Sequence, residues 1–425
     1  MTQNIAFETT NSGKPTEVSA PDERHPAAVS LLTGGGDKPY AFGLATELIR
    51  RGTPLDLIGS DDLDLPEFHG KSGVRFLNLR GDQRPEVTLG KKVLRVLVSY
   101  VKLIRYALTS KPRIFHLLWN NKFLYFDRTV LMLYYKLLGK RIAFTAHNVN
   151  AGRRDLNDTF LNRLTLRIQY QLADHLFVHT HKMKTELHSE FGVPENRVTV
   201  IPFGINNSVP NTSLTPAGAK QRLGIKAHQK TMLFFGHIAP YKGLEILIAA
   251  FQEVLSRDQE YLLIIAGRPK SCEEYWLAVQ SSFRKELQAG KILLKAEHIP
   301  DEETEVYFKA ADVLVLPYTH VYQSGVLFLG HSFGLPVLAA DVGSLKEEIV
   351  EGKTGFVFQP RDTADLCRVV ERYFASELFA NLDSKRKSIR DDAEASHSWE
   401  IVGQATVDVY AGLLQSSKMR GRTQG

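Results

Sequence analysis

Cysteine is scarce in this chain of 425 residues, which contains only Cys272 and Cys367. The two cysteines stand far apart and lack the spacing of metal ligands, so the sequence indicates neither a disulfide framework nor a zinc site. This scarcity fits a reducing compartment. We therefore expect a cytoplasmic protein without a metal site.

Long uncharged runs are also few. The longest stretch without Asp, Glu, Lys or Arg covers residues 313–340, but Pro317, Gly325 and Pro336 interrupt it. Its length alone would suit a membrane span, whereas the interruptions predict a buried strand, a loop, a helix and a second buried strand. We expect no transmembrane segment.

Composition and length bound the architecture. Apolar residues make up 43% and charged residues 24% of the chain, as in ordinary globular proteins. The length exceeds what one hydrophobic core usually organises, so we expect two domains. The expected organisation is a disordered tail at 1–25, an N-terminal domain at 26–205, a polar linker at 206–230, a C-terminal domain at 231–398, a helix at 399–415 that crosses back to the N-terminal domain, and a basic tail at 416–425.

In both halves, short apolar runs alternate with longer helical patterns. Apolar runs that predict strands lie at 28–32, 55–58, 74–77, 114–118, 141–146, 175–179, 198–201, 231–235, 261–266, 292–295, 313–316 and 337–340. Predicted helices include 41–51, 161–172, 183–191, 244–257, 273–287, 302–310, 326–333, 362–374 and 399–414. Such alternation is typical of parallel sheets. It predicts an α/β fold of two doubly wound, Rossmann-like domains.

Positive charge gathers in one segment. Residues 89–126 contain eight basic and no acidic residues, interleaved with apolar and aromatic ones. A basic amphipathic helix near 91–113 would bind an anionic membrane surface, whereas a half-buried helix with its Lys and Arg in water would need no partner. Both interpretations stand, and we expect no nucleic-acid partner.

Ligands of doubly wound domains bind at the carboxyl ends of the strands, so residues just after predicted strands are the candidates. In the first half these are a glycine turn, two histidines and their neighbours, which we expect to face a ligand: Gly34, Gly35, Gly36, His116, Trp119, Asn120, His147 and Asn148. In the second half, Lys242 opens a helix after a glycine turn, where a cation would neutralise a leaving diphosphate. Small residues at Gln323, Ser324, Gly325 and Val326 would leave backbone N–H groups free at another helix start.

The segments FFGHIAPYKGLEIL, LLIIAGRPK, HIPDEE, AADVLVLPY, QSGV and GLPVLAADVGSLKEEIVEGKTGFV resemble the nucleotide-sugar domain of group 1 glycosyltransferases, which have the GT-B fold. In the first half, the GGG loop, FTAHN, DHLFVHT and VTVIPFGINN look like the acceptor-domain elements of the same family. The resemblance covers most of residues 28–360. It implies two facing domains with a nucleotide diphosphate-sugar in the central cleft.

The resemblance also implies a mechanism and residue roles. Sugar transfer would retain the anomeric configuration, need neither metal nor cofactor, and use the leaving phosphate itself to deprotonate the acceptor hydroxyl. His147 and Lys242 would be the catalytic residues, with His147 at the donor sugar or the acceptor and Lys242 at the diphosphate. The acceptor-side residues would be Gly34, Gly35, Gly36, His116, Trp119, Asn120 and Asn148. The expected donor-binding residues are Gly236, His237, Lys242, Gly267, Arg268, Ile299, Pro300, Gln323, Ser324, Gly325, Val326 and Glu347, with the base near Ile299 and Pro300 and with Glu347 near the nucleotide.

Two departures from the family pattern stand out. Many members carry two glutamates around the second phosphate loop, and here these positions fall on Val321 and Leu329. The usual ribose-binding carboxylate is therefore missing. An arginine that often follows the first glycine turn is His237, a weaker phosphate partner at neutral pH.

Three functions therefore compete. The first is a glycosyltransferase of the hexosyltransferase type that uses a glycan, lipid-linked or other hydroxyl acceptor in polysaccharide or glycoconjugate biosynthesis, on the inner face of the cytoplasmic membrane. The second is a catalytically silent GT-B protein that binds a sugar nucleotide or a protein partner, which the lost glutamates favour. The third is a sugar-nucleotide epimerase with the same architecture. The sequence favours the first.

Overall fold

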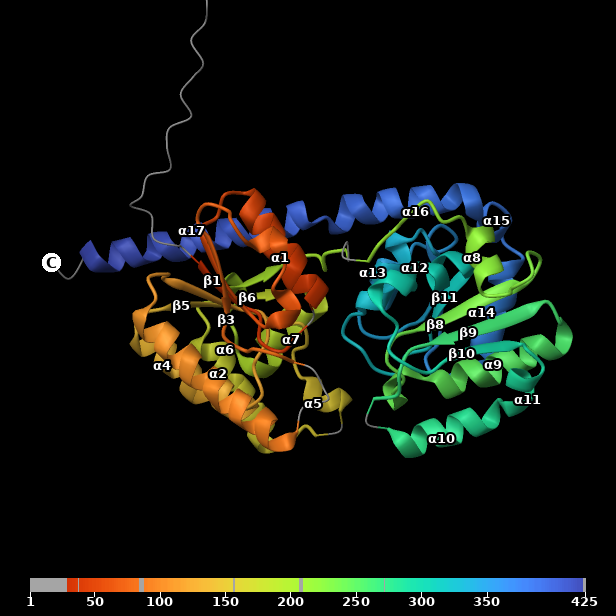
Figure 1. Ribbon diagram of the computed structural model, residues 1–425, viewed down its shortest axis with the longest axis horizontal. Helices are drawn as coiled ribbons and strands as arrows, with labels where there is room; N and C mark the ends of the chain where they lie inside the picture. Colours follow the sequence, from red (N-terminus) through yellow and green to blue (C-terminus); the bar gives the residue numbers. More distant parts are fainter. Residues whose placement is uncertain are drawn as a thin grey trace, which may run out of the picture.

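The computed structural model describes residues 29–36, 38–83, 88–155, 157–205, 209–270 and 272–422. They form two α/β units that lie beside each other (Figure 1). The expected tail at 1–25 lies outside the described residues. Each unit is built on one fully parallel sheet with helices on its faces, which is the doubly wound arrangement that the alternating pattern predicts.

The N-terminal domain has a seven-stranded sheet in the order β3-β2-β1-β4-β5-β6-β7. Its strands are β1 (Val29–Leu32), β2 (Leu55–Gly59), β3 (Val74–Asn78), β4 (Ile114–Leu117), β5 (Arg141–Thr145), β6 (His175–Val178) and β7 (Val198–Val200). Its helices are α1 (Lys38–Arg50), α2 (Leu89–Thr109), α3 (Leu124–Phe126), α4 (Met132–Leu137), α5 (Ala151–Arg154), α6 (Phe160–Leu172) and α7 (His181–Phe191). A π-helical turn, Asp127–Leu131, joins α3 to α4.

The C-terminal domain has a six-stranded sheet in the order β10-β9-β8-β11-β12-β13. Its strands are β8 (Lys230–Phe235), β9 (Tyr261–Ala266), β10 (Ile292–Lys295), β11 (Val313–Leu316), β12 (Val337–Ala340) and β13 (Gly355–Phe358). Its helices are α8 (Pro216–Arg222), α9 (Leu244–Arg257), α10 (Glu273–Ser282), α11 (Arg284–Gln288), α12 (Asp301–Ala310), α13 (Gly325–Ser332), α14 (Thr363–Phe374), α15 (Glu377–Ala380) and α16 (Leu382–His397).

The strands form where aliphatic runs can be buried on both faces of a sheet. Strands β1, β4, β9, β11 and β12 are buried along their whole length. Helices cover both faces of a parallel sheet, so its central strands need apolar side chains in both directions. The carboxyl ends of the two sets of strands carry the loops that face the space between the domains.

The chain crosses between the domains a second time near its end. Helix α17 (Trp399–Arg422) follows α16 directly, and the two run one after the other along the top of both domains (Figure 1). The backbone N–H of Ile205 donates to the carbonyl of His397 at 3.1 Å, and the Trp399 indole N–H donates to the carbonyl of Ile205 at 2.8 Å. Hydrogen bonds at Ile205 thus join the two segments in which the chain passes between the domains. Beyond this point, α17 packs against α1 and β4.

Several elements differ from the sequence prediction. The predicted helix at 273–287 divides into α10 and α11, because Phe283 between them turns into the core and is fully buried. The linker at 206–230 contains α8, which packs on α12. The basic helix ends at Thr109, so Lys111 and Arg113 do not belong to it. Helix α17 continues to Arg422, so residues 416–422 are helical where a tail was expected.

The uncharged stretch at 313–340 folds as predicted. It forms strand β11, a loop, helix α13 and strand β12 in that order. Among the described residues, no helix is both long enough and apolar enough to span a bilayer.

A buried carboxyl group lies in the π-helical turn. Asp127 is 2% exposed, and the Tyr100 hydroxyl from α2 donates to its two carboxylate oxygens at 2.9 and 3.1 Å. Burial raises the pKa of Asp127 to about 6. The folded state therefore binds a proton at Asp127 more tightly than the unfolded state does. Protonation of Asp127 stabilises the folded state fully below the unfolded pKa, and this stabilisation is lost as the pH rises through 6.

Replacing Asp127 by asparagine is accordingly expected to stabilise the protein at pH 7.5 by about 2–3 kcal/mol, because about two pKa units of unfavourable ionisation disappear while an acceptor for Tyr100 remains. Urea unfolding at pH 4.5 and pH 7.5 measures this. Asp158→Asn is the control with the opposite sign, since Arg163 lowers the pKa of Asp158 to about 2. A destabilised Asp127→Asn at pH 7.5 would contradict the assignment.

Candidate active site

A cavity of about 290 Å³ lies between the two domains. The N-terminal domain contributes the start of α1 and the segment after β7, and the C-terminal domain contributes the loops after β8 and β11 and the first half of α13. The lining residues are Pro39, Tyr40, Phe203, Gly204, Tyr241, Lys242, Val321, Gln323, Ser324, Gly325, Val326 and Leu329. Five of them, Lys242 and Gln323 to Val326, are among the expected donor-binding residues, so the structure brings these together.

Lys242 is the cation in the cavity wall. It ends a single 3₁₀ turn, Pro240–Lys242, directly before α9, and it is 8% exposed. Its ammonium group donates to the Tyr318 hydroxyl at 2.5 Å and lies 4.0 Å from the centre of the Tyr318 ring. The Tyr318 hydroxyl also lies 3.3 Å from Ser324 Oγ. A buried tyrosine thus holds the lysine beside the start of α13.

Glycines bring the loops after β8 and β9 into contact. A side chain at Gly267 would place its Cβ 1.8 Å from the carbonyl oxygen of Gly236, and one at Gly243 would place it 2.0 Å from the carbonyl oxygen of Pro317. Gly236 and Gly243 have φ values of 101° and 65°, in the left-handed region that favours glycine. These loops close only without side chains, and the closure positions Lys242.

Positive charge surrounds His237 at the ends of β8 and β9. Burial, followed by the charges of Lys270 and Arg268, lowers the pKa of His237 to about 4. His237 is therefore neutral at pH 7, and the positive charge here belongs to its neighbours. Cations gathered at strand ends suit an anionic ligand.

Helix α13 begins at the cavity. Ser324 is its N-cap, its side chain makes no capping hydrogen bond, and Gly325 is exposed. The first N–H groups of a helix lack partners within the helix and carry its positive dipole end. Gln323 precedes the cap, and both polar atoms of its amide are buried without a hydrogen-bond partner among the described residues. A buried amide without partners costs about 1–3 kcal/mol, which a ligand with hydroxyl or phosphate oxygens would offset.

Behind the N-terminal wall lies an aromatic cluster around His147. Its ring stacks on Trp119 at 4.1 Å with 3° between the planes, and the Tyr40 ring meets it edge-on at 4.6 Å. Tyr40 lines the cavity, and His147 packs against it without lining the cavity. Burial lowers the pKa of His147 well below its ordinary value, so it is neutral at pH 7.

The hydrogen bonds define the tautomers of two histidines. His179 Nδ1 lies 3.3 Å from the carbonyl oxygen of Ile201, which only accepts, so this nitrogen carries the proton. His179 Nε2 then accepts from His147 Nδ1 at 3.0 Å. His147 Nε2 is consequently an acceptor, and it is buried without a partner among the described residues. It is suited to accept a hydrogen bond from a hydroxyl group.

The aromatic cluster around His147 packs against the glycine turn after β1. A Cβ at Gly36 would lie 1.8 Å from Cδ2 of the Trp119 indole, and one at Gly34 would lie 2.2 Å from the Trp119 carbonyl oxygen. Gly35 would meet only the end of the Arg80 side chain, at 3.2 Å. Two of the three glycines are thus required by Trp119, and through it they support the position of His147.

Other expected site residues lie elsewhere. His116 is fully buried, bonded to Tyr410 of α17 at 2.6 Å and to Thr145 at 2.7 Å, so it is structural and we no longer assign it to the acceptor side. Asn120 exchanges amide hydrogen bonds with Gln169 at 3.3 and 2.8 Å. Asn148 is partly exposed in the loop after β5.

Seven expected donor residues do not line the cavity: Gly236, His237, Gly267, Arg268, Ile299, Pro300 and Glu347. Ile299 packs in the C-terminal core at 7% exposure, and Pro300 caps the start of α12. Glu347 is exposed on the 3₁₀ turn after β12.

Sequence reasoning missed His179, Tyr40 and Phe203. Phe203 and Tyr40 line the cavity, and the Phe203 ring stacks on Phe328 of α13 at 5.4 Å across the domain boundary. A signal existed for His179, which follows β6 as His147 follows β5, because neighbouring parallel strands end at the same edge. Tyr40 and Phe203 carry no comparable signal. Among the described residues, no group of three or more His, Cys, Asp or Glu side chains is placed to hold a metal ion.

Comparisons with known proteins agree with this architecture. The family described as "Glycosyltransferase Family 4" matches residues 34–209, and "Glycosyl transferases group 1" matches residues 229–376. A D-inositol 3-phosphate glycosyltransferase from Streptomyces avermitilis is 29% identical over 258 residues, which are 59% of this chain and 54% of the relative. The chain thus matches about half the length of this relative.

Solved structures match over a longer range. Sucrose-phosphate synthase from Thermosynechococcus elongatus superimposes with a TM-score of 0.71 at 18% identity, over 91% of this chain and 99% of that one. Anabaena HepE in complex with UDP and glucose gives a TM-score of 0.68 at 15% identity, over 91% and 100%. With the two family matches on its two domains and a cation-bearing cavity between them, the chain belongs to the group 1 glycosyltransferases and has the GT-B fold.

Proposed function

We propose that this glycosyltransferase moves a sugar from a nucleotide diphosphate-sugar to a hydroxyl acceptor, with retention of anomeric configuration and without metal, in polysaccharide or glycoconjugate biosynthesis. The interdomain cavity carries the proposal: Lys242 and the start of α13 offer positive charge on one wall, beside the unpartnered amide of Gln323. The similarity to HepE, whose structure holds UDP and glucose, makes a UDP-sugar the first donor to test.

The lining of the cavity favours a retaining mechanism. None of the described residues that line it is Asp, Glu, Cys or His, so its wall supplies neither a carboxylate nucleophile nor a strong general base. The leaving diphosphate would itself accept the proton of the acceptor hydroxyl. The bond from the anomeric carbon to the phosphate oxygen breaks, the acceptor oxygen bonds to the same face of that carbon, and the proton passes to a phosphate oxygen. Lys242 stabilises the negative charge of the leaving group.

The sugar would lie between Gln323 and the His147 cluster. The Gln323 amide offers one acceptor and two donors, and His147 Nε2 offers one acceptor. A hexose presents hydroxyl groups that donate and accept, so it can satisfy both. Tyr40 lines the cavity and meets the His147 ring edge-on, so it connects the cavity wall to the His147 cluster. Leu329 adds an apolar surface to the cavity, at a position where the family resemblance implies a glutamate.

A thermal-shift screen of the purified protein against UDP, GDP and ADP, first with EDTA and then with Mg²⁺, tests the function. A ligand at 100 times its Kd stabilises the native state by about 2.7 kcal/mol, a rise of several degrees in Tm. We expect one nucleotide to give this shift in EDTA, and NMR of the product to show the anomer of the donor. No shift with any nucleotide would favour the catalytically silent alternative that binds a protein partner, and an inverted product would overturn retention.

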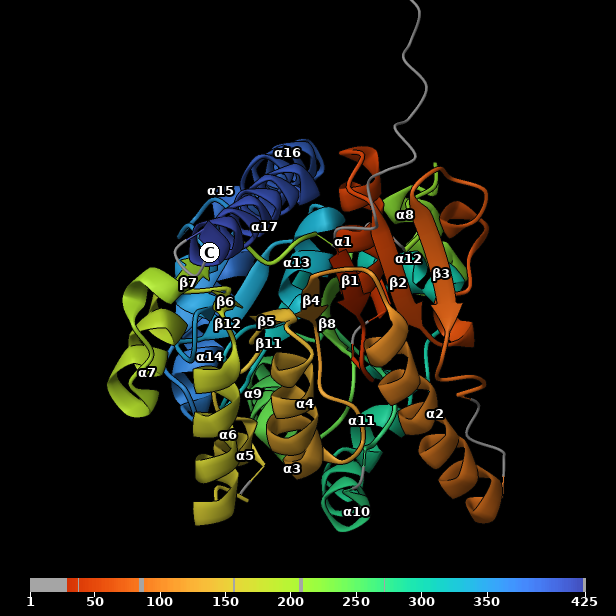
Figure 2. The same cartoon turned by 90° about the vertical axis from the view of Figure 1, so that its left-hand side faces the viewer.

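We further propose that the N-terminal domain docks on an anionic membrane, at the cytoplasmic face. Helix α2 buries only part of its apolar surface and exposes Val93, Leu94, Leu97, Val98, Val101, Ile104 and Leu108 beside its basic residues. Exposed apolar residues continue on the neighbouring segments: Phe123, Leu124, Tyr125, Val130, Leu133 and Leu137, and then Phe160, Leu161 and Leu164 on α6. Figure 2 shows α2, α4 and α6 side by side on this face. Single exposed apolar residues are ordinary on a protein surface. A contiguous set of them beside lysines favours membrane binding over the alternative of a helix that only faces water.

A double variant, Leu94→Ser with Leu108→Ser, tests the docking surface, and Leu277→Ser is its matched control. Leu94, Leu108 and Leu277 are 62%, 64% and 64% exposed, but Leu277 lies on α10 in the other domain. We expect the double variant to lower binding to phosphatidylglycerol vesicles at least ten-fold, since burying each leucine side chain in the membrane contributes roughly 1.5 kcal/mol or more to the binding free energy. Co-sedimentation measures the bound fraction. Equal binding by the double variant and the control would show that α2 is ordinary surface.

A further inference from the structure

Tyr322 belongs to the C-terminal domain by sequence but to the N-terminal domain by packing. It lies in the loop between β11 and α13, directly before Gln323. Its side chain is 8% exposed and packs in the hydrophobic cluster of the N-terminal domain, with Val149 and Tyr170 among its members. One side chain of the donor loop therefore crosses the domain boundary and is buried on the other side.

Hydrogen bonds fix both the backbone carbonyl and the side-chain hydroxyl of Tyr322. In its own domain, the carbonyl oxygen of Tyr322 accepts from the backbone N–H of Ser344 at 3.1 Å and from the Ser344 hydroxyl at 2.9 Å. Gly343 permits this approach, because a Cβ there would lie 2.1 Å from the carbonyl oxygen of Val321. In the other domain, the Tyr322 hydroxyl donates to the Glu186 carboxylate on α7 at 2.9 Å.

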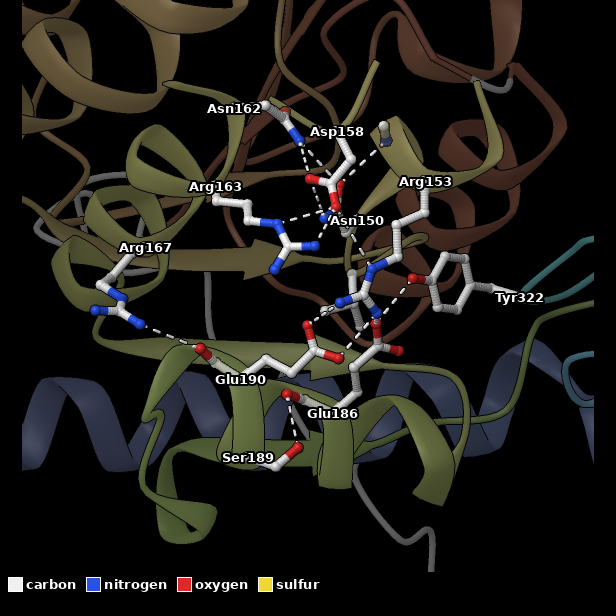
Figure 3. A network of polar contacts seen from close by, with 12 residues as sticks. Asn150, Arg153, Asp158, Asn162, Arg163, Arg167, Glu186, Ser189, Glu190 and Tyr322 are labelled. Atoms are coloured by element: carbon white, nitrogen blue, oxygen red, sulfur yellow. Dashed lines mark hydrogen bonds and ion pairs between the residues drawn. The ribbon is translucent and has the colours of Figure 1, made fainter. Parts of the chain in front are cut away.

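The contact at Glu186 continues to the loop that carries His147. Arg153 on α5 donates to Glu186 at 3.0 Å and to Glu190 at 2.8 Å, and it lies 3.6 Å from Asp158. Asp158 accepts from the side chain of Asn150 at 2.8 Å. Figure 3 shows Tyr322 reaching this network from the C-terminal side. Asn150 is fully buried, caps α5, and stands three residues after His147.

We infer that Tyr322 is a positioning residue that sets the closed spacing of the two domains, and with it the distance from the donor loop at Gln323 to His147. The domains also meet where Ile205 contacts His397 and Trp399 and where Phe203 stacks on Phe328, and a rotation about Ile205 would withdraw Tyr322 from Glu186. A second interdomain cavity, of about 750 Å³, borders Tyr322 and shares Val321 with the first. Closure would therefore change both cavities together. The inference rests on the proposed function for its catalytic consequence.

Tyr322→Phe, Glu186→Ala and the double variant test the inference, with Tyr373→Phe as the matched control. Tyr373 also donates from a buried hydroxyl, to the carbonyl of Asp312 at 2.5 Å, but within one domain. We expect Tyr322→Phe to lower kcat about ten-fold while the Kd of the nucleotide changes less than two-fold, because the proposed nucleotide contacts lie in the C-terminal domain. The double variant should be no slower than Glu186→Ala alone, since either single substitution already removes the hydrogen bond between Tyr322 and Glu186.

A second measurement separates this inference from the proposed function. Small-angle X-ray scattering of the full chain should give a larger radius of gyration for Tyr322→Ala than for wild type or Tyr373→Phe, whether or not sugar is transferred. Scattering curves that coincide for all three proteins would overturn the inference. So would additive losses in the double variant, or a raised Kd with kcat unchanged. A wild-type protein that neither binds nucleotide nor transfers sugar, but shows the scattering difference, would contradict only the proposed function.

Discussion

Replacing Lys242 by methionine is expected to lower kcat by about a hundred- to a thousand-fold. Removing one preorganised donor from a site of developing charge typically costs about 3–4 kcal/mol in the transition state. Lys242 lies in the cavity wall, and Tyr318 holds its ammonium group beside the start of α13. Methionine keeps most of the side-chain volume, so we expect the free energy of unfolding to change by about 1 kcal/mol or less. Initial rates of sugar transfer and urea unfolding measure the two effects.

Lys309→Met is the matched control for this variant. Lys309 is also 8% exposed, but its ammonium group pairs with Glu305 at 3.0 Å and donates to the carbonyl of Thr212 at 2.6 Å, away from the cavity. Its loss leaves the buried Glu305 carboxylate without a cation, with only the hydrogen bonds from Thr212, which costs about 3 kcal/mol of stability, while kcat of the folded fraction should be unchanged. If Lys242→Met loses stability and keeps its rate, Lys242 is structural and the donor mechanism fails.

The fold was predictable because its strands carry a strong local signal. Apolar runs such as 261–266 and 313–316 are buried on both faces, and their boundaries coincide with β9 and β11. Strand β13 and helix α16 escaped prediction. Helix α16 is rich in charged residues and buries only Leu382, Arg386, Ile389 and Ala393, so its helical pattern was weak. The π-helical turn at Asp127 depends on a contact with Tyr100, 27 residues away, and no local pattern carries it.

The candidate site was predictable where residues follow strands and hard to predict where the site depends on packing between domains. Lys242 and the segment from Gln323 to Val326 follow β8 and β11, which are neighbours in the sheet, so one rule placed them together. The same rule was applied to His116, but His116 lies within β4, where its ring bonds Thr145 and Tyr410 of α17. A side chain inside a central strand is buried between the sheet and its covering helices, so it does not reach the ligand edge. Phe203 packs at the site against Tyr40 and against Phe328 of the other domain, and neither contact is local in the sequence.

The glycine turn after β1 shows a different limit of sequence reasoning. Three consecutive glycines predicted a close approach of backbone to ligand, and the close approach in the structure is by Trp119. Gly36→Ala is therefore expected to lower kcat by about ten- to a hundred-fold. The new methyl group would overlap the indole that stacks on His147, and displacement of a positioned group by about 1 Å can cost a hundred-fold in rate. The overlap should also cost about 1–3 kcal/mol of stability, measured by urea unfolding.

Gly35→Ala distinguishes packing from ligand approach at this turn. Neither Gly35 nor Gly36 has a φ in the left-handed region, so alanine strains the backbone at neither position. At Gly35 the new methyl group meets only the flexible end of Arg80, at 3.2 Å, and we expect near wild-type rates and stability. If instead the turn bound a substrate through its backbone at Gly35, the Gly35→Ala variant would also lose rate while keeping its stability. The kcat of Gly35→Ala therefore decides whether these glycines serve Trp119 and His147 or contact a ligand directly.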